Sequence, residues 1–299
     1  MKTNSTRQLR ISWFEKNIQW MLIVPTVILL LALTVYPLVY LVIGMFHTIN
    51  IRTGERTFVG LGNFIEMVQD PFFWNAMKNT AIYTCSAVAI EFGLGLFLAV
   101  ALSRRIVGRN IFRSLILTPM MLPPIVAAVI FKIIYMPDFG ILNWFLALFG
   151  IEGIIWEASV NTALISLIIV DVWQWTPFMF LILLAGLQAI PLDPYEAAEV
   201  DGATGLQIFR DITFPLLKPA VLIALLLRIM DTFRIFDQIF IMTGGGPANA
   251  TETMSIYIYR HGFRFSDVGY ATAMSFVMLI ITIMISNIFI KRLRTEEVF

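Results

Sequence analysis

Cysteine, histidine and charged residues are all scarce in this chain of 299 residues. The single cysteine, Cys85, lies inside an apolar run, which excludes a disulfide framework. Two histidines are too few for a zinc site built from cysteine and histidine. A net charge of +1 provides no basic field for nucleic acid. None of the six lysines follows a glycine, so the chain lacks the Gly-Lys-Ser/Thr end of an ATP-binding P-loop.

Apolar residues are what the chain has in abundance. They make up 59% of the sequence, while charged residues make up 14%, against roughly 25% in a typical soluble domain. The mean hydropathy is +0.82. Several apolar runs reach the roughly 20 residues that a helix needs to span a bilayer. We predict six transmembrane helices, at about 22–45, 76–102, 114–135, 160–187, 216–242 and 269–290. The predicted fold class is all-α integral membrane.

The remaining segments are short. Residues 1–20 are predicted as an N-terminal arm, residues 21–292 as the transmembrane domain and residues 293–299 as a tail. A signal peptide is the alternative for the first run, but its apolar core would be shorter and followed by a small-residue cleavage site. We therefore expect a retained helix. Pro119, Pro123 and Pro124 should distort the first half of the third helix.

Positive charge near the membrane predicts the orientation. With the N-terminus in the cytoplasm, thirteen of the 21 lysines and arginines fall in cytoplasmic segments and five on the opposite face. Loops rich in lysine and arginine stay in the cytoplasm. We expect a multi-pass protein of the cytoplasmic (inner) membrane with both termini in the cytoplasm.

A polar segment at 191–215 interrupts the apolar runs between the fourth and fifth predicted helices. Asp193 is predicted as an N-cap, with Glu196 completing a capping box, and Gly202 as the end of that helix. Thr204 and Gln207 repeat the same spacing for a second short helix. The segment therefore reads as a bent pair of helices, either an amphipathic loop on the membrane surface or a docking element for a partner protein.

Polar residues inside two apolar runs are the second signal. A charge near the bilayer centre costs on the order of 3 kcal/mol and normally faces a cavity or a partner. In each of the fourth and fifth runs, several polar or aromatic side chains repeat at helical spacing and share one face. The candidate cavity residues are Asp171, Gln174, Trp175, Arg228, Asp231 and Thr232.

Such a lining suits a hydroxyl-rich ligand, because charged groups form paired hydrogen bonds with sugar hydroxyls. The competing interpretations are intrahelical ion pairs, Arg228 with Asp231 and Asp231 with Arg234, or an Arg228 that binds a partner helix. Glu91 and Asn79 are expected to make hydrogen bonds between helices rather than to contact a ligand.

The polar segment also carries a recognisable motif. Its spacing resembles the EAA motif of permease subunits in binding-protein-dependent ABC importers, although Phe214 stands where the family usually has leucine. The residues that the resemblance assigns to ATPase coupling are Glu196, Ala197, Ala198, Asp201, Gly202, Ile212 and Pro215. Further stretches, at 58–64, 113–119, 173–178, 236–247 and 269–273, resemble the sugar-transporting branch, and within it the first permease of maltose-type transporters.

The resemblance implies a type I ABC importer permease fold, alternating access and a carbohydrate substrate. It implies a second homologous permease in a heterodimer, two cytoplasmic ATP-binding subunits and an extracytoplasmic solute-binding protein. ATP and Mg would bind on the partner ATPase, so this chain itself is expected to be no enzyme and to hold no cofactor or metal. Charges stand where maltose-type members have neutral polar groups, which leaves an anionic or amino-bearing sugar derivative open.

Two other functions compete with this interpretation. An ion-coupled secondary transporter would use Asp171, Arg228 and Asp231 as a relay and would work without ATP. A membrane enzyme would need a catalytic constellation, and the scarcity of histidine argues against one.

Overall fold

The structure is a computed structural model that describes residues 5–49, 53–103 and 108–296. Several charges used to predict the orientation, and the last three residues of the predicted tail 293–299, lie outside these ranges; the charges concerned are Lys2, Arg52, Arg104 and Arg105. Within the described ranges the protein is almost entirely helical, which confirms the predicted fold class.

Five stretches of the described chain are long and apolar enough to cross a membrane. Three of them lie in single helices, α1 (Ser5–Gly44), α3 (Pro71–Ser103) and α7 (Ala163–Ala189). A fourth is α13 (Val268–Glu296). The fifth, Gly205–Met242, is a succession of helical pieces: α9 (Gly205–Ile208), the π-helical η2 (Phe209–Thr213), α10 (Phe214–Phe233) and α11 (Asp237–Met242).

The run predicted as the third transmembrane helix is not continuous. It consists of α4 (Arg109–Leu117), the 3-10 turn η1 (Pro119–Met121) and α5 (Pro124–Ile134). Proline removes a backbone N–H and disfavours helical geometry in the residue before it. The prolines at 119, 123 and 124 therefore break the run, and the expectation that they would merely distort one long helix was too mild.

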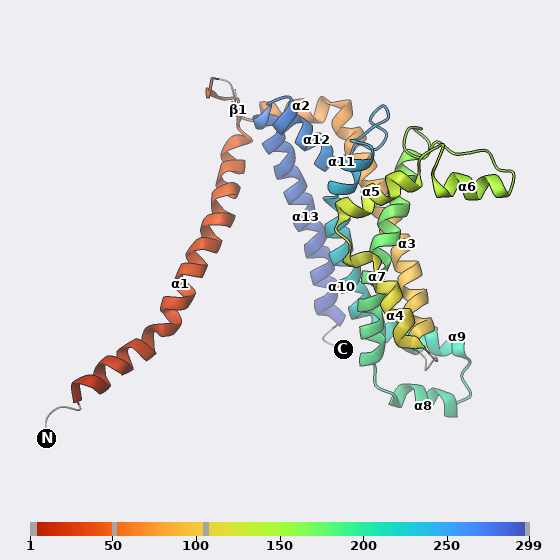
Figure 1. The fold of residues 1–299 in the computed structure, drawn as a ribbon. Coiled ribbons are helices and arrows are strands. Elements are labelled where there is room, and N and C mark those ends of the chain that lie inside the picture. Colours follow the sequence, from red (N-terminus) through yellow and green to blue (C-terminus); the bar gives the residue numbers. More distant parts are fainter. Residues whose placement is uncertain (1–4, 50–52, 104–107, 297–299) are drawn as a thin grey trace.

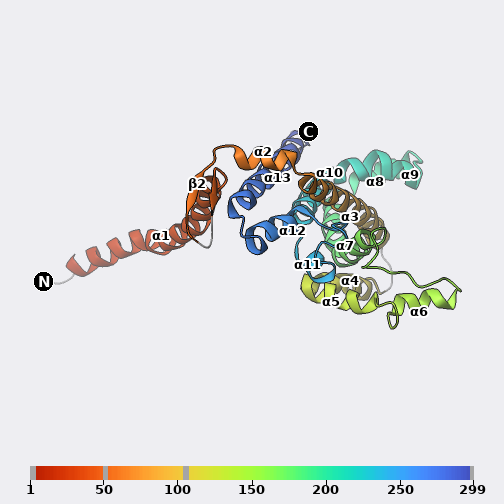
Figure 2. The same cartoon turned by 90° about the horizontal axis from the view of Figure 1, so that it is seen from above.

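Helix α1 leaves the rest of the molecule. The described part of the predicted arm 1–20 is helical and continues without a break into the first apolar stretch, because the helix begins at Ser5 and the stretch at Trp20. Only 6% of the apolar window in this helix is buried, and Figures 1 and 2 show it leaning away from the bundle. It meets α13 at one end, where a Cβ on Gly44 would lie 2.9 Å from the Thr272 hydroxyl.

The bundle is built around the contact between α3 and α7. Gly95 allows this close approach, because a Cβ there would lie 2.7 Å from the Cβ of Met179. Helix α10 packs against both members of this pair, and α13 packs against α10, as the view from above shows (Figure 2). Buried leucine, phenylalanine and valine side chains from α3, α7 and α10 form one hydrophobic core; its largest members are Phe180, Leu183 and Leu217.

Short elements lie toward the end of the bundle at the top of Figure 1. They are the hairpin β1 (His47–Ile49) with β2 (Arg56–Phe58), and the helices α2 (Gly62–Gln69), α12 (Met254–Tyr259) and η3 (Arg260–Arg264). A further helix, α6 (Ile141–Leu148), projects sideways from the bundle. Asn79 reaches the loop before α12 and donates hydrogen bonds to the carbonyls of Asn249 and Glu252, at 3.0 and 3.1 Å. Helix α8 (Asp193–Val200) lies at the opposite end of the bundle.

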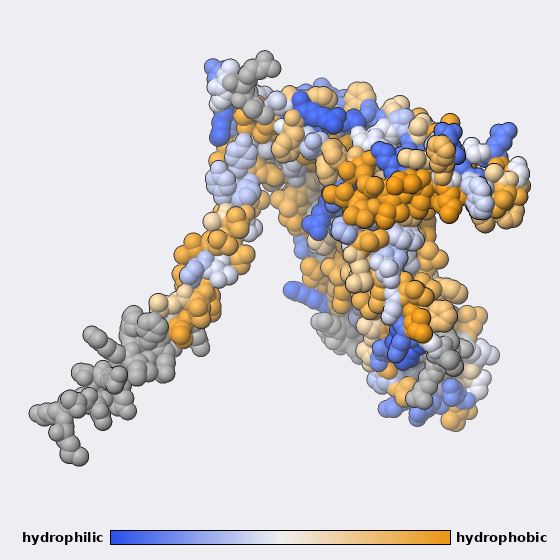
Figure 3. Space-filling view, in the orientation of Figure 1, coloured by the Kyte–Doolittle hydropathy of each residue, from blue (hydrophilic) through white to orange (hydrophobic). Residues whose placement is uncertain are grey.

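The polarity of the surface differs between the ends and the flank of the bundle. Hydrophilic side chains gather near the two ends of the bundle in Figure 3, and apolar side chains cover much of the flank between them. A helix whose exposed side is apolar along this length is covered by lipid or by other helices. The described bundle therefore has the surface of a membrane protein.

Candidate functional site

The segment 191–215, called the docking element below, folds as a bent pair of short helices. Helix α8 ends at Val200, and Gly202 just beyond it has a φ of +73°, a left-handed conformation that glycine adopts without strain. The N–H groups of Gly202 and Ala203 donate to the carbonyls of Glu199 and Ala198, at 3.1 and 2.9 Å. These bonds satisfy the last carbonyls of the helix, and the predicted stop at Gly202 is confirmed.

One of the two predicted capping boxes is present. The Thr204 N–H donates to Oε1 of Gln207 at 2.7 Å, so α9 begins as predicted. The other prediction was wrong, because α8 starts at Asp193 itself and has Leu192 in the cap position without a side-chain hydrogen bond. Asp193 and Glu196 instead lie in the first turn, where a carboxylate is favoured by the positive end of the helix dipole.

Most of the predicted coupling residues lie on the outer surface of the docking element. Glu196, Ala197, Asp201 and Gly202 are exposed, whereas Ala198 is buried; Ile212 and Pro215 are half-buried at its base. Large apolar side chains are exposed beside the carboxylates, namely Leu192, Val200 (88%) and Leu206 (77%). Apolar side chains rimmed by charge at the end of a bundle are the kind of surface that a partner protein covers.

A hollow separates the docking element from the bundle. Its volume is about 370 Å³, and it lies between α8 and the ends of α3 and α7. Leu187 and Ile190 line it from the bundle, and Tyr195 and Glu199 line it from α8. Helix α8 is therefore joined to the bundle mainly by the chain on its two sides, which comes from α7 and continues through α9 and η2 into α10.

The polar residues predicted inside the membrane come together around Arg228 on α10. Its Nε and Nη2 donate to the two carboxylate oxygens of Glu91 on α3, at 2.7 and 2.8 Å. Nη2 also donates to Asp171 on α7 at 2.9 Å, and Nη1 donates to Asp231 on α10 at 2.7 Å. These four residues are called the charge cluster below. They tie three helices together.

The charge cluster is buried on one side and open on the other. Glu91 and Asp171 are 0% exposed and Arg228 is 1% exposed, but the side chain of Asp231 is 44% exposed. The ring of Trp175, half-buried on α7, covers the guanidinium of Arg228 at 4.9 Å from its centroid. Asp231 and Trp175 are thus the residues of the predicted cavity that remain accessible.

The other predicted cavity residues are enclosed by protein. Gln174 is 0% exposed, donates to the Leu122 carbonyl at 2.8 Å and accepts from Gln238 at 2.7 Å. Thr232 is 1% exposed and donates to the carbonyl of Arg228, one turn back, at 2.8 Å. Gln174, Asp171 and Arg228 therefore bond between separate elements of the chain, whereas the bond of Thr232 stays within α10.

Two contacts of this network agree with predictions made from the sequence. The intrahelical pair of Arg228 with Asp231 is present, and Glu91 bridges helices as expected. The partnership between Glu91 and Arg228 was missed, although a lone glutamate in an apolar run required a cation from elsewhere. Among the described residues, no ion pair joins Asp231 to Arg234.

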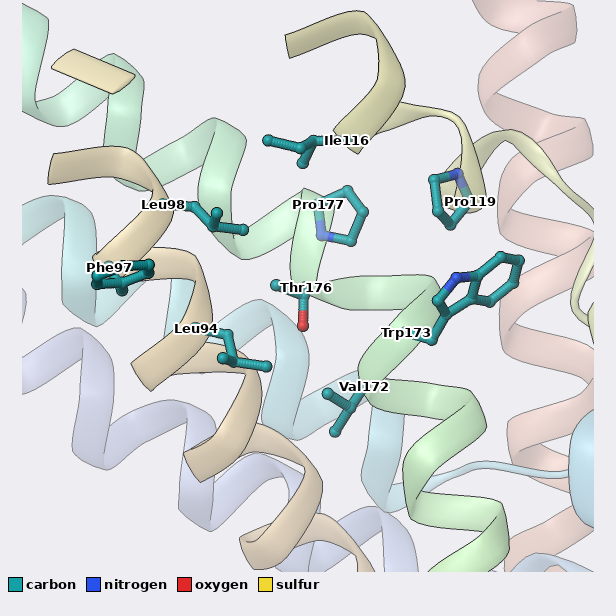
Figure 4. Close-up of a pocket in the computed structure, with 9 residues that line it drawn as sticks. All are labelled: Leu94, Phe97, Leu98, Ile116, Pro119, Val172, Trp173, Thr176 and Pro177. Atoms are coloured by element: carbon teal, nitrogen blue, oxygen red, sulfur yellow. The ribbon is translucent and has the colours of Figure 1, made fainter. Parts of the chain in front are cut away.

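The opposite face of α7 borders a separate pocket. It has a volume of about 320 Å³ and lies between α3, α7 and the turn η1 (Figure 4). Its lining is apolar except for Thr176, whose hydroxyl is buried and has no hydrogen-bond partner. Trp173 and Pro177 border it from the same helix. Helix α7 thus has the charge cluster on one face and a hollow on the other.

Residues 91–295 match the family described as the binding-protein-dependent transport system inner membrane component. The chain belongs to this family. It is therefore an integral membrane component of a transport system and not an enzyme.

Named relatives match over nearly the whole chain. The trehalose/maltose transport system permease protein MalF of Thermococcus litoralis is 35% identical, over 97% of this chain and 98% of its own length. The sulfoquinovosyl glycerol transport system permease protein SmoG of Agrobacterium fabrum is 36% identical, over 93% of this chain and 90% of its own length.

Solved structures share the fold. A bacterial ABC transporter involved in the import of the acidic polysaccharide alginate contains a chain that matches with a TM-score of 0.83 at 21% identity, over 95% of this chain and 98% of that one. A second alginate transporter structure, in complex with a periplasmic protein that holds an alginate pentasaccharide, matches with a TM-score of 0.80. The fold is that of the type I importer permeases, as predicted.

Proposed function

We propose that this chain is the permease subunit of an ATP-driven importer that moves a sugar or a sugar derivative across the cytoplasmic membrane by alternating access. Family membership supports the importer, and relatives named for the transport of trehalose/maltose and of sulfoquinovosyl glycerol support the substrate class. The position of the docking element, at the end of a helix that continues into the charge cluster, is the observation that carries the mechanism.

The importer would be assembled from several subunits. A second homologous permease completes the pathway, two cytoplasmic subunits bind ATP and Mg, and a solute-binding protein delivers the sugar from outside. The excess of positive charge in the segments assigned to the cytoplasm supports an orientation with both termini and the docking element inside. The alginate transporter bound to its periplasmic protein is a precedent for the last partner.

Coupling would run through the docking element. The exposed Glu196 and Asp201, with the apolar tips of Val200 and Leu206, would sit in a cleft of the ATP-binding subunit. Closure of two such subunits around ATP would then move α9, η2 and α10 as one body. Because Arg228 lies on α10 and binds α3 and α7, the same movement reaches the helices beside the substrate path.

Substrate contact in this subunit is proposed for Asp231 and Trp175. An exposed carboxylate in a membrane-spanning helix is costly unless it faces water or a partner. The exposure of Asp231 therefore supports a water-filled path beside it. An aromatic side chain next to a carboxylate provides both an apolar ring face and a hydrogen-bond acceptor for a sugar.

The test uses the complete importer in lipid vesicles. We expect Glu196→Lys to assemble but to lose most sugar-dependent stimulation of ATP hydrolysis and most uptake, because it reverses a charge in the proposed contact. Glu55→Lys, the same change at an exposed site on the opposite end, is the matched control and should behave as wild type.

Normal stimulation and uptake with Glu196→Lys would refute the coupling role. An ion-coupled secondary transporter predicts a different result, which is uptake by this chain alone, driven by an ion gradient without ATP.

A further inference from the structure

The charge cluster carries more negative than positive groups. Arg228 supplies one positive charge to three carboxyl groups, those of Glu91, Asp171 and Asp231. Two of the three carboxyl groups would have to carry protons for the cluster to be neutral. The member of the cluster whose side chain is exposed at the surface of this subunit is Asp231, which carries a carboxyl group.

Arg228 is not available to bind an anion. Its guanidinium has five N–H groups, and the charge cluster uses donors on all three of its nitrogens. Trp175 covers one face of the guanidinium, and the residue is 1% exposed. An arginine that bound a sugar carboxylate or phosphate would instead need an open pair of donors.

Asp231 presents the charge of the cluster to whatever lies beside α10. Its side chain is 44% exposed although it is part of a membrane-spanning stretch. Arg228 holds one of its oxygens at 2.7 Å and so fixes the side chain in position. A positioned carboxylate attracts an ammonium group, accepts hydrogen bonds from hydroxyls and repels another carboxylate.

Among the described residues, neither Lys132 nor Arg234 forms an ion pair with Asp231. Lys132 donates to the carbonyl of Ile241 at 3.1 Å, at the contact between α5 and α11. Arg234 is exposed, but it lies beyond the end of α10, where the backbone has left helical geometry. Arg234 therefore provides a matched control of opposite charge for the test below.

We infer that Asp231 is a specificity-determining residue that makes this subunit accept neutral or amino-bearing sugars and reject anionic ones. This inference rests on the proposed function. Family membership leaves the question open, because the relatives and structural neighbours include both trehalose/maltose and acidic alginate systems. The arrangement of the charge cluster, with Arg228 buried and Asp231 exposed, is what favours neutral or amino-bearing sugars over anionic ones.

The experiment compares three sugars of one skeleton in the complete importer, in vesicles, with saturating sugar and solute-binding protein. They are maltose, its uronic-acid counterpart and its amino-sugar counterpart. Uptake of each charged sugar is divided by uptake of maltose, in wild type and in Asp231→Asn. The contribution of the binding protein is the same in both, so it cancels when the two quotients are compared.

We expect Asp231→Asn to raise the uptake of anionic relative to neutral sugar about tenfold, which corresponds to about 1.4 kcal/mol. The uptake of amino sugar relative to neutral sugar should fall by a similar factor. The asparagine keeps an oxygen that accepts from Arg228, so the fold should be retained, and an unchanged melting temperature of the complex checks this. Arg234→Gln should leave both quotients within about twofold of wild type, because the exposed Arg234 side chain forms no ion pair with Asp231 and water screens its charge.

The outcomes separate the inference from the proposed function. If wild-type importer takes up none of the three sugars with ATP, the proposed sugar transport is wrong. If it transports sugar but prefers the anionic form, the inference is wrong. Equal loss of all three sugars in Asp231→Asn would also overturn it, because Asp231 would then pair with the second permease and not contact substrate.

Discussion

Replacing Arg228 with methionine should destabilise the bundle more than replacing any one carboxylate of the charge cluster with the matching amide. Methionine fills a similar volume but leaves Glu91 and Asp171, both 0% exposed, without their cation. Breaking a buried ion pair by removing one partner typically costs about 3–5 kcal/mol. We expect Arg228→Met to fall in this range.

The hydrogen bonds of Arg228 set an upper bound on the free energy of unfolding that its replacement can remove. Arg228 donates four hydrogen bonds of 2.7 to 2.9 Å to carboxylates. At about 1.5–3 kcal/mol for each bond to a charged group, their simple sum would be roughly 6–12 kcal/mol. That sum is an upper bound, because the orphaned carboxyl groups can take up protons, and the bond to the exposed Asp231 is weakened by water.

The assay is thermal unfolding of the purified complex in detergent, with a double-mutant cycle. Glu91→Gln alone should cost less than Arg228→Met, because the amide still accepts a hydrogen bond. In the double variant the loss should be smaller than the sum of the two single losses, because no carboxylate at 91 remains to be orphaned. Strictly additive losses, or an Arg228→Met variant as stable as wild type, would refute the idea that these residues hold α3, α7 and α10 together.

Two further predictions concern packing and pH. Gly95→Ala should destabilise by about 1–3 kcal/mol by overpacking against Met179, whereas Gly93→Ala, where nothing lies within 4 Å, should not destabilise; equal melting temperatures would contradict this. Burial raises the pKa of Asp70, but hydrogen bonds from Tyr257 and Tyr270 outweigh it and leave that pKa below 3.8. The stabilisation is therefore present above that value and lost as pH falls through the folded pKa, so the deficit in melting temperature of Asp70→Asn should shrink at the lowest pH tested; a constant deficit would exclude this linkage.

Local patterns located five of the six predicted membrane-spanning stretches and most of the docking element. Runs of apolar residues located the membrane-spanning stretches, because the length of such a run is set by the thickness of the bilayer. Gly202 and the pair Thr204–Gln207 were predictable for a similar reason, since a helix end is decided by groups within a few residues. The error at Asp193 was also local, because a residue that can cap a helix is equally able to occupy its first turn.

Partners distant along the chain could not be predicted. Glu91 and Arg228 are 137 residues apart, and only the packing of α3 against α10 brings them into contact. The six candidate cavity residues were chosen because they share helical faces, but a shared face does not tell a buried polar contact from a cavity wall. Arg228 has enough donors to satisfy three carboxyl groups at once, and this property draws Asp171 into a buried contact between helices.

Helix α7 can move only if it has space, and the pocket in Figure 4 provides that space. From Gly205 to Arg228 the chain covers roughly 35 Å at 1.5 Å per residue, so a pull on the docking element reaches the charge cluster through one helical run. Through its ion pair with Asp171, Arg228 would then pull α7, which has a hollow on its other face to move into.

Thr176→Phe would fill part of this hollow of about 320 Å³ and remove a buried hydroxyl that has no partner. We expect the melting temperature of the complex to stay equal or rise, while ATP-driven uptake falls at least tenfold, because the filled pocket blocks the movement of α7. Thr176→Val keeps the volume of threonine, removes the same hydroxyl and should transport as wild type. Full uptake by Thr176→Phe, measured in vesicles alongside the valine control, would show that α7 does not move into this pocket during transport.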